Sequence, residues 1–181
     1  MLRGLYRLPP VAAVAQPLAH CTLVGSGAIL HEVVEAARWL AEHWQVQADV
    51  CSATSFSELA RDGMAAERQR ALGGASLMPW ATQVLQDTQG PIVAATDYVR
   101  AVPEQLRAWV PAGRRYATLG TDGFGRSDSR ANLRDFFEVN PRHIVQRALQ
   151  ALADDGSLPT SVPEAARQRY GITTGPAPWL V

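Results

Sequence analysis

The sequence contains no lysine, so every one of its seventeen basic residues is an arginine. This absence excludes a lysine Schiff base and the lysine-dependent phosphate-binding loop. The acidic residues also number seventeen, which makes the formal net charge zero. No basic stripe is present that would neutralise nucleic-acid phosphates or hold a membrane surface. We therefore expect neither a nucleic acid nor a membrane among the partners.

Cysteine and histidine are scarce. Cys21 and Cys51 form no CxxC motif, and the N-terminal segment "MLRGLYRLPP" lacks the continuous apolar core of a secretory signal. Reduced thiols and a cytoplasmic location are therefore expected. The four histidines never show HxH or HxxxH spacing, and no GxSxG nucleophile elbow occurs. The residues alone thus predict neither a metal site nor a serine hydrolase.

What the sequence does contain is a regular alternation of two kinds of segment. Short apolar runs predict buried strands, and runs with apolar residues three and four apart predict amphipathic helices. The predicted strands cover residues 21–27, 46–53, 91–96 and 115–121. The predicted helices cover residues 28–44, 55–62, 80–88, 98–110, 130–137, 143–156 and 162–171. This alternation predicts an α/β fold with a mostly parallel sheet covered on both faces, formed by residues 1–181 as a single domain.

Right-handed crossovers place the segments that follow all four strands at the carboxyl edge of the sheet. Open α/β sheets bind ligands at this edge, where the strand order reverses. The segments gathered there are "GSG", "SATS", "ATDY" and "GTDGFGR". The candidate anion or interface residues are Ser26, Gly27, Asp97, Tyr98, Asp122, Gly123, Gly125, Arg126, Asp128 and Arg130.

The first of these segments lies within "LVGSGAIL", which begins like a dinucleotide fingerprint. Leu30 stands where the third glycine belongs, and the next strand ends without an acidic residue for a ribose. A plain strand-to-helix turn is therefore favoured over dinucleotide binding. The backbone amides of Ser26 and Gly27 could still bind an anion at the start of the helix.

Two local signals set helix ends. Ser55 and Glu58 have the spacing of a capping box, and Gly63 stands where a C-terminal cap would end a short helix. Pro103 is compatible with the helix predicted over 98–110 only near its first turn.

The stretch "LGTDGFGRSDSRANLRDFFEV", residues 119–139, allows three interpretations. The amides of Gly123 and Gly125 together with Arg126 could hold a phosphate. Alternatively, Asp128 or Ser129 caps a helix that runs from about residue 130 to 137, with Arg130 and Arg134 as an i,i+4 surface pair. An arginine could equally reach across a subunit boundary. Composition and spacing favour the cap but leave the other two open.

The same stretch closely resembles the C-terminal signature of the homodimeric bacterial pyruvate dehydrogenase E1 family. The segments "LVGSGAILHEVVEAARWLAEHWQVQADVCSATSFSELARDG" and "PIVAATDYVRAVPEQLRAWVP" occur in the order and at the spacing of that family. "GLYRL" resembles the edge strand that precedes this domain. The resemblance covers most of residues 4–150, and "GTDGFGRSDSR" is its most specific part.

This resemblance implies a domain like the C-terminal domain of transketolase, as a fragment of a longer E1 subunit. The implied fold is a three-layer α/β/α arrangement with a five-stranded mixed sheet in the order 1-3-2-4-5. The first strand is antiparallel, and Ser26, Asp97 and Tyr98 line the crevice where the order reverses.

The resemblance also implies a function. The full-length enzyme decarboxylates pyruvate with thiamine diphosphate and Mg²⁺, and reductively acetylates the lipoyl group of the E2 dihydrolipoyl acetyltransferase. Its implied partners are the rest of the E1 subunit, a second E1 subunit and E2. The GDG motif that binds the cofactor is absent from this chain. We therefore expect no catalytic, cofactor or metal-binding residue here, an inactive isolated domain, and a role in structure and subunit contacts through Arg126 and Arg130. The alternative is a free-standing α/β module that binds a small anion or nucleotide.

Overall fold

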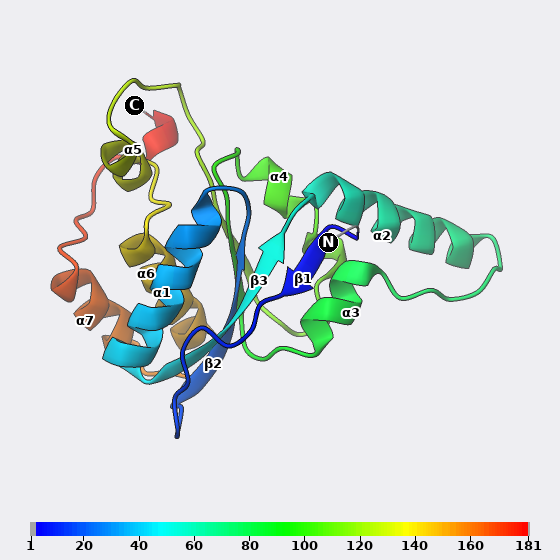
Figure 1. Ribbon diagram of the computed structural model, residues 1–181, viewed down its shortest axis with the longest axis horizontal. Coiled ribbons are helices and arrows are strands. Elements are labelled where there is room, and N and C mark those ends of the chain that lie inside the picture. The colour runs from blue at the N-terminus through cyan, green and yellow to red at the C-terminus, as the bar shows by residue number, and fades with distance from the viewer. Residues whose placement is uncertain (1–2, 181) are drawn as a thin grey trace.

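The computed structural model describes residues 3–180, which fold around one mixed sheet (Figure 1). Its strands are β1 Leu5–Arg7, β2 Ala19–Gly25, β3 Val46–Ala53, β4 Ile92–Ala95 and β5 Tyr116–Leu119. The order in the five-stranded sheet is β1-β3-β2-β4-β5. β1 is antiparallel to β3, and the other neighbours are parallel. The predicted fold class and strand order are thus confirmed.

Seven α-helices connect and follow the strands within the described residues. They are α1 Ile29–Trp44, α2 Phe56–Ala71, α3 Trp80–Gln86, α4 Ala101–Glu104, α5 Arg130–Phe136, α6 Pro141–Asp154 and α7 Ser161–Arg169. Two short 3₁₀ helices, η1 Arg107–Trp109 and η2 Pro178–Leu180, complete the list. α6 begins before the predicted residue because the Asn140 side chain caps it and Pro141 occupies its first position.

Two hydrophobic cores lie on opposite faces of the sheet. Leu23 and Val93 enter the core that α1 and α6 cover, whereas their neighbours Val24 and Ala94 enter the core under α2 and α3. This alternation follows from the two-residue period of a strand. Because both faces are covered, the central strand β4 is apolar throughout and β2 is mostly apolar.

The two cysteines lie inside this sheet, Cys21 on β2 and Cys51 on β3. Both are free and buried. Burial is the main reason that the pKa of each thiol is raised to about 12. Neither thiol therefore provides a thiolate nucleophile at neutral pH.

The helix α2 is longer than its sequence predicts. Ser55 caps its first turn as expected, since its hydroxyl accepts a hydrogen bond from the amide of Glu58. The prediction that Gly63 ends the helix is wrong, because α2 continues to Ala71 and projects from the body of the molecule (Figure 1). Gly63 instead allows the ring of Trp109 to pack against the helix backbone.

The helix predicted over 98–110 is also different in the structure. Only Ala101–Glu104 is α-helical, with Pro103 in its first turn, and the chain then tightens into η1. The hydroxyl of Tyr116 donates a hydrogen bond of 2.7 Å to the carbonyl oxygen of Pro103. That oxygen would otherwise accept the amide of residue 107, so a contact from β5 competes with the continuing helix.

Candidate functional site

The strand order reverses between β2 and β4, and the residues that follow these two strands meet there. Ser26 follows β2 and Thr96 follows β4, and their hydroxyl oxygens lie 2.8 Å apart. Both residues are buried. The amide of Tyr98 donates to the hydroxyl oxygen of Thr96 at 3.2 Å. This hydrogen-bonded centre sits where the topology predicts a crevice.

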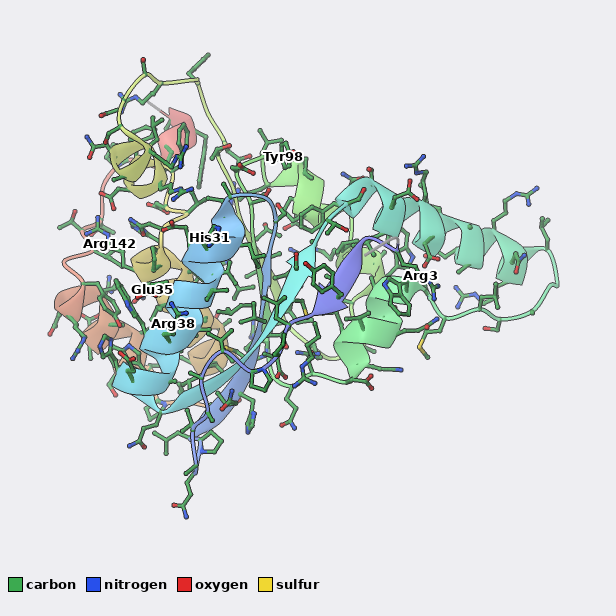
Figure 2. All side chains as sticks on the ribbon, in the orientation of Figure 1. Arg3, His31, Glu35, Arg38, Tyr98 and Arg142 are labelled. Atoms are coloured by element: carbon green, nitrogen blue, oxygen red, sulfur yellow. The ribbon has the colours of Figure 1, made fainter. Side chains whose placement is uncertain are left out.

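Two cavities flank this centre. The arginine cavity has a volume of about 450 Å³ and is bordered by the start of α1, the loop after β5 and α5. The hydroxyl cavity has a volume of about 660 Å³ and lies between the ends of β2 and β3 and the loop after β4. In Figure 2, Tyr98 lies beside α4, at the end of the molecule where α1 and α2 begin.

The structure divides the predicted site residues between these cavities. The arginine cavity contains Asp97, Gly123, Gly125, Arg126 and Arg130 in its lining. The hydroxyl cavity contains Ser26, Gly27 and Tyr98. Asp122 and Asp128 line neither of them. The site residues that the sequence predicts therefore do not form one cluster, although all lie near the carboxyl edge of the sheet.

Gly27 separates the two cavities at the start of α1. Its φ of +53° is in the left-handed region, and a Cβ at this position would lie 3.5 Å from a carboxylate oxygen of Asp97. The amide of Ser26 donates to the carbonyl of Ala95, so it is used within the sheet. Of the two backbone amides predicted to bind an anion, that of Ser26 is therefore already used in a hydrogen bond to Ala95.

Asp122 forms an ion pair with Arg100 at the same edge of the sheet. Its carboxylate accepts hydrogen bonds from the Nε of Arg100 at 2.9 Å and from the Arg100 backbone amide. The guanidinium of Arg100 also lies 4.3 Å from the ring centre of Trp179, near the C-terminus. Asp122 thus fixes Arg100 between the loop after β5 and the C-terminal segment.

The C-terminal segment reaches this edge by running from α7 along one side of the molecule, and Figure 1 shows its end beside α5. Gly123, with a φ of +117°, is in close contact with it, because a Cβ there would lie 2.7 Å from the carbonyl oxygen of Pro178. No pattern in the sequence predicts this contact. The only signal was the glycine itself, whose partner lies more than fifty residues away.

The tip of the loop is exposed. Phe124 is 80% exposed, and a Cβ at Gly125 would meet nothing within 4 Å. The guanidinium of Arg126 lies 4.0 Å from the ring centre of Phe136, a cation–π contact. Among residues 3–180, neither Arg126 nor Arg130 forms an ion pair with an acidic side chain, although the charge of Arg126 helps to lower the pKa of Asp128. An exposed aromatic ring and two exposed arginines without an ion pair therefore lie together at the loop tip.

Both residues proposed as the cap of α5 take part in the cap. The side chain of Ser129 accepts from the amide of Asn132, which makes Ser129 the N-cap. The carboxylate of Asp128 accepts from the Ser129 amide and from the side-chain amide of Asn132. The Ser129 amide is the main cause that lowers the pKa of Asp128. The cap that the sequence favours is therefore present.

Arg134 departs from its predicted surface role. Instead of forming a surface pair with Arg130, the Arg134 side chain forms an ion pair of 2.6 Å with Glu32 on α1. The two side chains are only 20% and 17% exposed. This pair joins α5 to α1 and closes one side of the arginine cavity.

Within residues 3–180, no cluster of three or more histidine, cysteine, aspartate or glutamate side chains is arranged to hold a metal ion. No helix there is both long and apolar enough to cross a bilayer.

Comparison with known proteins gives a consistent result. Residues 4–140 match the Transketolase-like TK C-terminal domain family. The pyruvate dehydrogenase E1 component of Pseudomonas aeruginosa is 45% identical over 95% of this chain and 19% of its own length. The same component of Mycobacterium tuberculosis is 42% identical over 98% and 20%, and that of Haemophilus influenzae is 46% identical over 94% and 19%. The chain thus spans about a fifth of the length of these relatives.

Solved structures share the fold. A split-gene transketolase, an inactive β4 tetramer, superposes with a TM-score of 0.51 at 20% identity over 82% of this chain and 44% of that chain. The transketolase of Pichia stipitis in complex with sedoheptulose 7-phosphate gives 0.51 at 21% identity over 84% and 18%. The chain therefore belongs to the Transketolase-like TK C-terminal domain family, and the relatives that it resembles over nearly its whole length are pyruvate dehydrogenase E1 components.

Proposed function

We propose that this chain acts as the C-terminal part of a pyruvate dehydrogenase E1 component, and that it contributes folding and subunit contacts rather than reacting groups. The observation that carries the proposal is an identity of 42–46% over 94–98% of the chain, confined to about a fifth of each relative. In this role the chain would work in the cytoplasm, which agrees with its free, buried cysteines.

The residues present do not fit thiamine diphosphate and its Mg²⁺. A diphosphate–magnesium site needs oxygen ligands grouped around the cation. No such acidic cluster occurs in residues 3–180, and the sequence lacks the GDG motif. We propose that the rest of a full-length E1 subunit binds the cofactor and acts on pyruvate.

The loop tip supports a role in contacts. Phe124 is exposed, and the exposed Arg126 and Arg130 form no ion pair in the described chain. Aromatic and arginine side chains are enriched where protein interfaces bind most strongly. We propose that the tip contacts the remainder of E1 or the second subunit of a homodimer, and that the assembled dimer works with E2.

A chimera tests the proposed function. Residues 4–181 would replace the matching fifth of the Pseudomonas aeruginosa E1 component, and pyruvate-dependent acetylation of a lipoyl domain would be measured. We expect an active, dimeric chimera, whereas the 181-residue chain alone should show no activity and no thiamine diphosphate binding by calorimetry. A folded but inactive chimera, or cofactor binding by the chain alone, would refute the proposal.

The role of the loop is tested in the same chimera. Replacing Phe124, Arg126 and Arg130 with alanine should weaken the dimer by more than tenfold in sedimentation, because aromatic and arginine anchors dominate interface energies. Arg147→Ala, an exposed arginine on α6, is the matched control. An unchanged dimer would assign the contacts to another surface.

A further inference from the structure

The second half of α2 and the segment that follows it form a projecting arm, residues 64–78. Every residue from Glu67 to Met78 is exposed, whereas the first half of α2 buries Phe56 and Leu59 in the core. Figure 1 shows the arm extending away from the sheet, with α3 beside its base. The arm therefore receives little packing from the rest of the described chain.

The end of the helix in this arm is nevertheless well defined. The amide of Gly74 donates to the carbonyl oxygen of Gln69 at 2.9 Å, and the amide of Gly73 donates to that of Arg70 at 3.1 Å. With a φ of +74° at Gly73, these hydrogen bonds form a Schellman motif, which ends a helix through local contacts alone. The motif holds the arm in shape, so less conformational entropy is lost when another surface covers it.

The arm carries four large apolar side chains that are open to solvent. Met64, Leu72, Leu77 and Met78 are 53%, 68%, 56% and 48% exposed. Leu77 also lines a hollow of about 230 Å³ between the arm and Trp109. Apolar side chains gathered on an exposed projection are typical of a surface that binds another protein segment.

The free charges on the arm are positive. Arg68 and Arg70 are exposed and form no ion pair among residues 3–180. The carboxylate of Glu67, the one acidic residue between positions 64 and 78, accepts a hydrogen bond from the indole Nε1 of Trp109 at 3.0 Å. Electrostatic complementarity therefore favours an apolar partner surface that also carries carboxylates.

The N-terminal end of the described chain lies at the base of the arm. A guanidinium nitrogen of Arg3 lies 3.8 Å from a carboxylate oxygen of Asp62 on α2, and the guanidinium carbon lies 4.0 Å from the ring centre of Trp80 on α3. Figure 2 shows Arg3 at this place between the two helices. Under the proposed function most of an E1 subunit precedes residue 4, since the match spans about a fifth of each relative. That larger part joins the domain next to the arm, and the covalent link gives it a high effective concentration there.

We infer that the arm docks onto the part of the same E1 subunit that precedes residue 4, on an apolar surface that carries acidic side chains. The four apolar side chains of the arm supply the buried contacts, and Arg68 and Arg70 pair with the carboxylates. This inference rests on the proposed function and deepens it, because it adds a contact surface separate from the loop tip.

The test compares hydrogen exchange of the arm amides in the free 181-residue chain and in the chimera with the Pseudomonas aeruginosa E1 component. The arm has the same sequence in both proteins, so a difference in rate reports protection alone. We expect exchange over residues 67–78 to be at least about tenfold slower in the chimera, because covered amides exchange only when the contact opens. The exposed turn at residues 154–157 is the control and should exchange equally in both.

The possible failures of this test are distinguishable. An active chimera whose arm exchanges as fast as in the free chain would overturn this inference and leave the proposed function intact. An inactive chimera would refute the proposed function, and the inference with it. Protection in the free chain that rises with its concentration would assign the arm to a second copy of the chain, which also overturns the inference.

A pair of leucine variants separates docking from the stability of the fold. Leu72→Glu should abolish the protection in the chimera, because it places a carboxylate against an acidic, apolar surface. Leu18→Glu, at a position 65% exposed on β2's approach and outside the arm, is the matched control and should retain the protection. The two variants should have the same urea midpoint in the free chain. Full protection in the Leu72→Glu chimera would contradict the docking.

A photo-reactive benzoylphenylalanine in place of Ser76 identifies the occupant in the chimera. Cross-links within one subunit leave the mass of a single subunit on a denaturing gel, and this is the expected result. A band with the mass of two subunits would show that the second subunit covers the arm, and would overturn the inference.

Discussion

The ring of Trp109 packs against the backbone of Gly63, so closely that a Cβ at residue 63 would lie 2.3 Å from two ring atoms. We predict that Gly63→Ala destabilises the fold by about 1–3 kcal/mol, although alanine is favoured over glycine inside a helix by about 1 kcal/mol. Urea unfolding measures the change. Gly125→Ala, where nothing lies within 4 Å, is the control and should be nearly neutral. A more stable Gly63→Ala would contradict the packing described.

The ion pair between Arg134 and Glu32 predicts a difference between two nearby arginines. Arg134→Ala should cost about 1–3 kcal/mol of unfolding free energy, because it leaves a mostly buried carboxylate without its partner. Arg130→Ala, at an exposed position, should change stability by less than about 0.5 kcal/mol. A double-mutant cycle with Glu32→Ala measures the coupling, and a value near zero would show that the pair does not join the helices.

His143 predicts a dependence of stability on pH. Burial, assisted by the charge of Arg142, lowers the pKa of His143 from 6.5 to about 4. Between these values the unfolded chain binds a proton that the folded chain does not, so stability should fall as the pH drops from 6.5 to 4. The contribution is about 2 kcal/mol. His143→Gln should remove this part of the pH dependence in urea unfolding, whereas the exposed His31→Gln should retain it.

These three relationships show where sequence reasoning reached its limit. The periodicity of apolar residues was enough to predict the central strands and the helices α1, α3, α6 and α7 closely, because those signals are local. The caps at Ser55 and Ser129 were also local. Gly63 was misread as a helix end because its partner, Trp109, lies 46 residues further along the chain. Arg134 was misread for the same reason, since Glu32 is 102 residues away.

The candidate site was predictable as a place but not as a set of contacts. The family resemblance implied that Ser26, Asp97 and Tyr98 lie at the reversal of strand order, and the structure has them there. The structure also divides these three residues between two cavities, which Gly27 and the Ser26–Thr96 hydrogen bond separate.

The contact between Gly123 and Pro178 predicts that the loop holds the C-terminal segment in place. Gly123→Ala should expose residues 172–177 and speed their cleavage by proteinase K several-fold, because the new Cβ would clash with the Pro178 carbonyl. Gly113→Ala is the control, since Gly113 also has a positive φ but no neighbour within 4 Å. Equal cleavage of the two variants would mean that backbone strain alone, and not the contact, is responsible.

The buried positions of Cys21 and Cys51 have a practical consequence for chemical labelling. Their thiols lie inside the sheet with pKa values near 12, and the sequence has no lysine side chain to compete for electrophiles. A cysteine introduced by Phe124→Cys, at a position 80% exposed, would be the one thiol that a maleimide dye reaches under native conditions. A single fluorophore could thus be attached to the loop tip without altering either native cysteine, and its emission would report directly on what docks there.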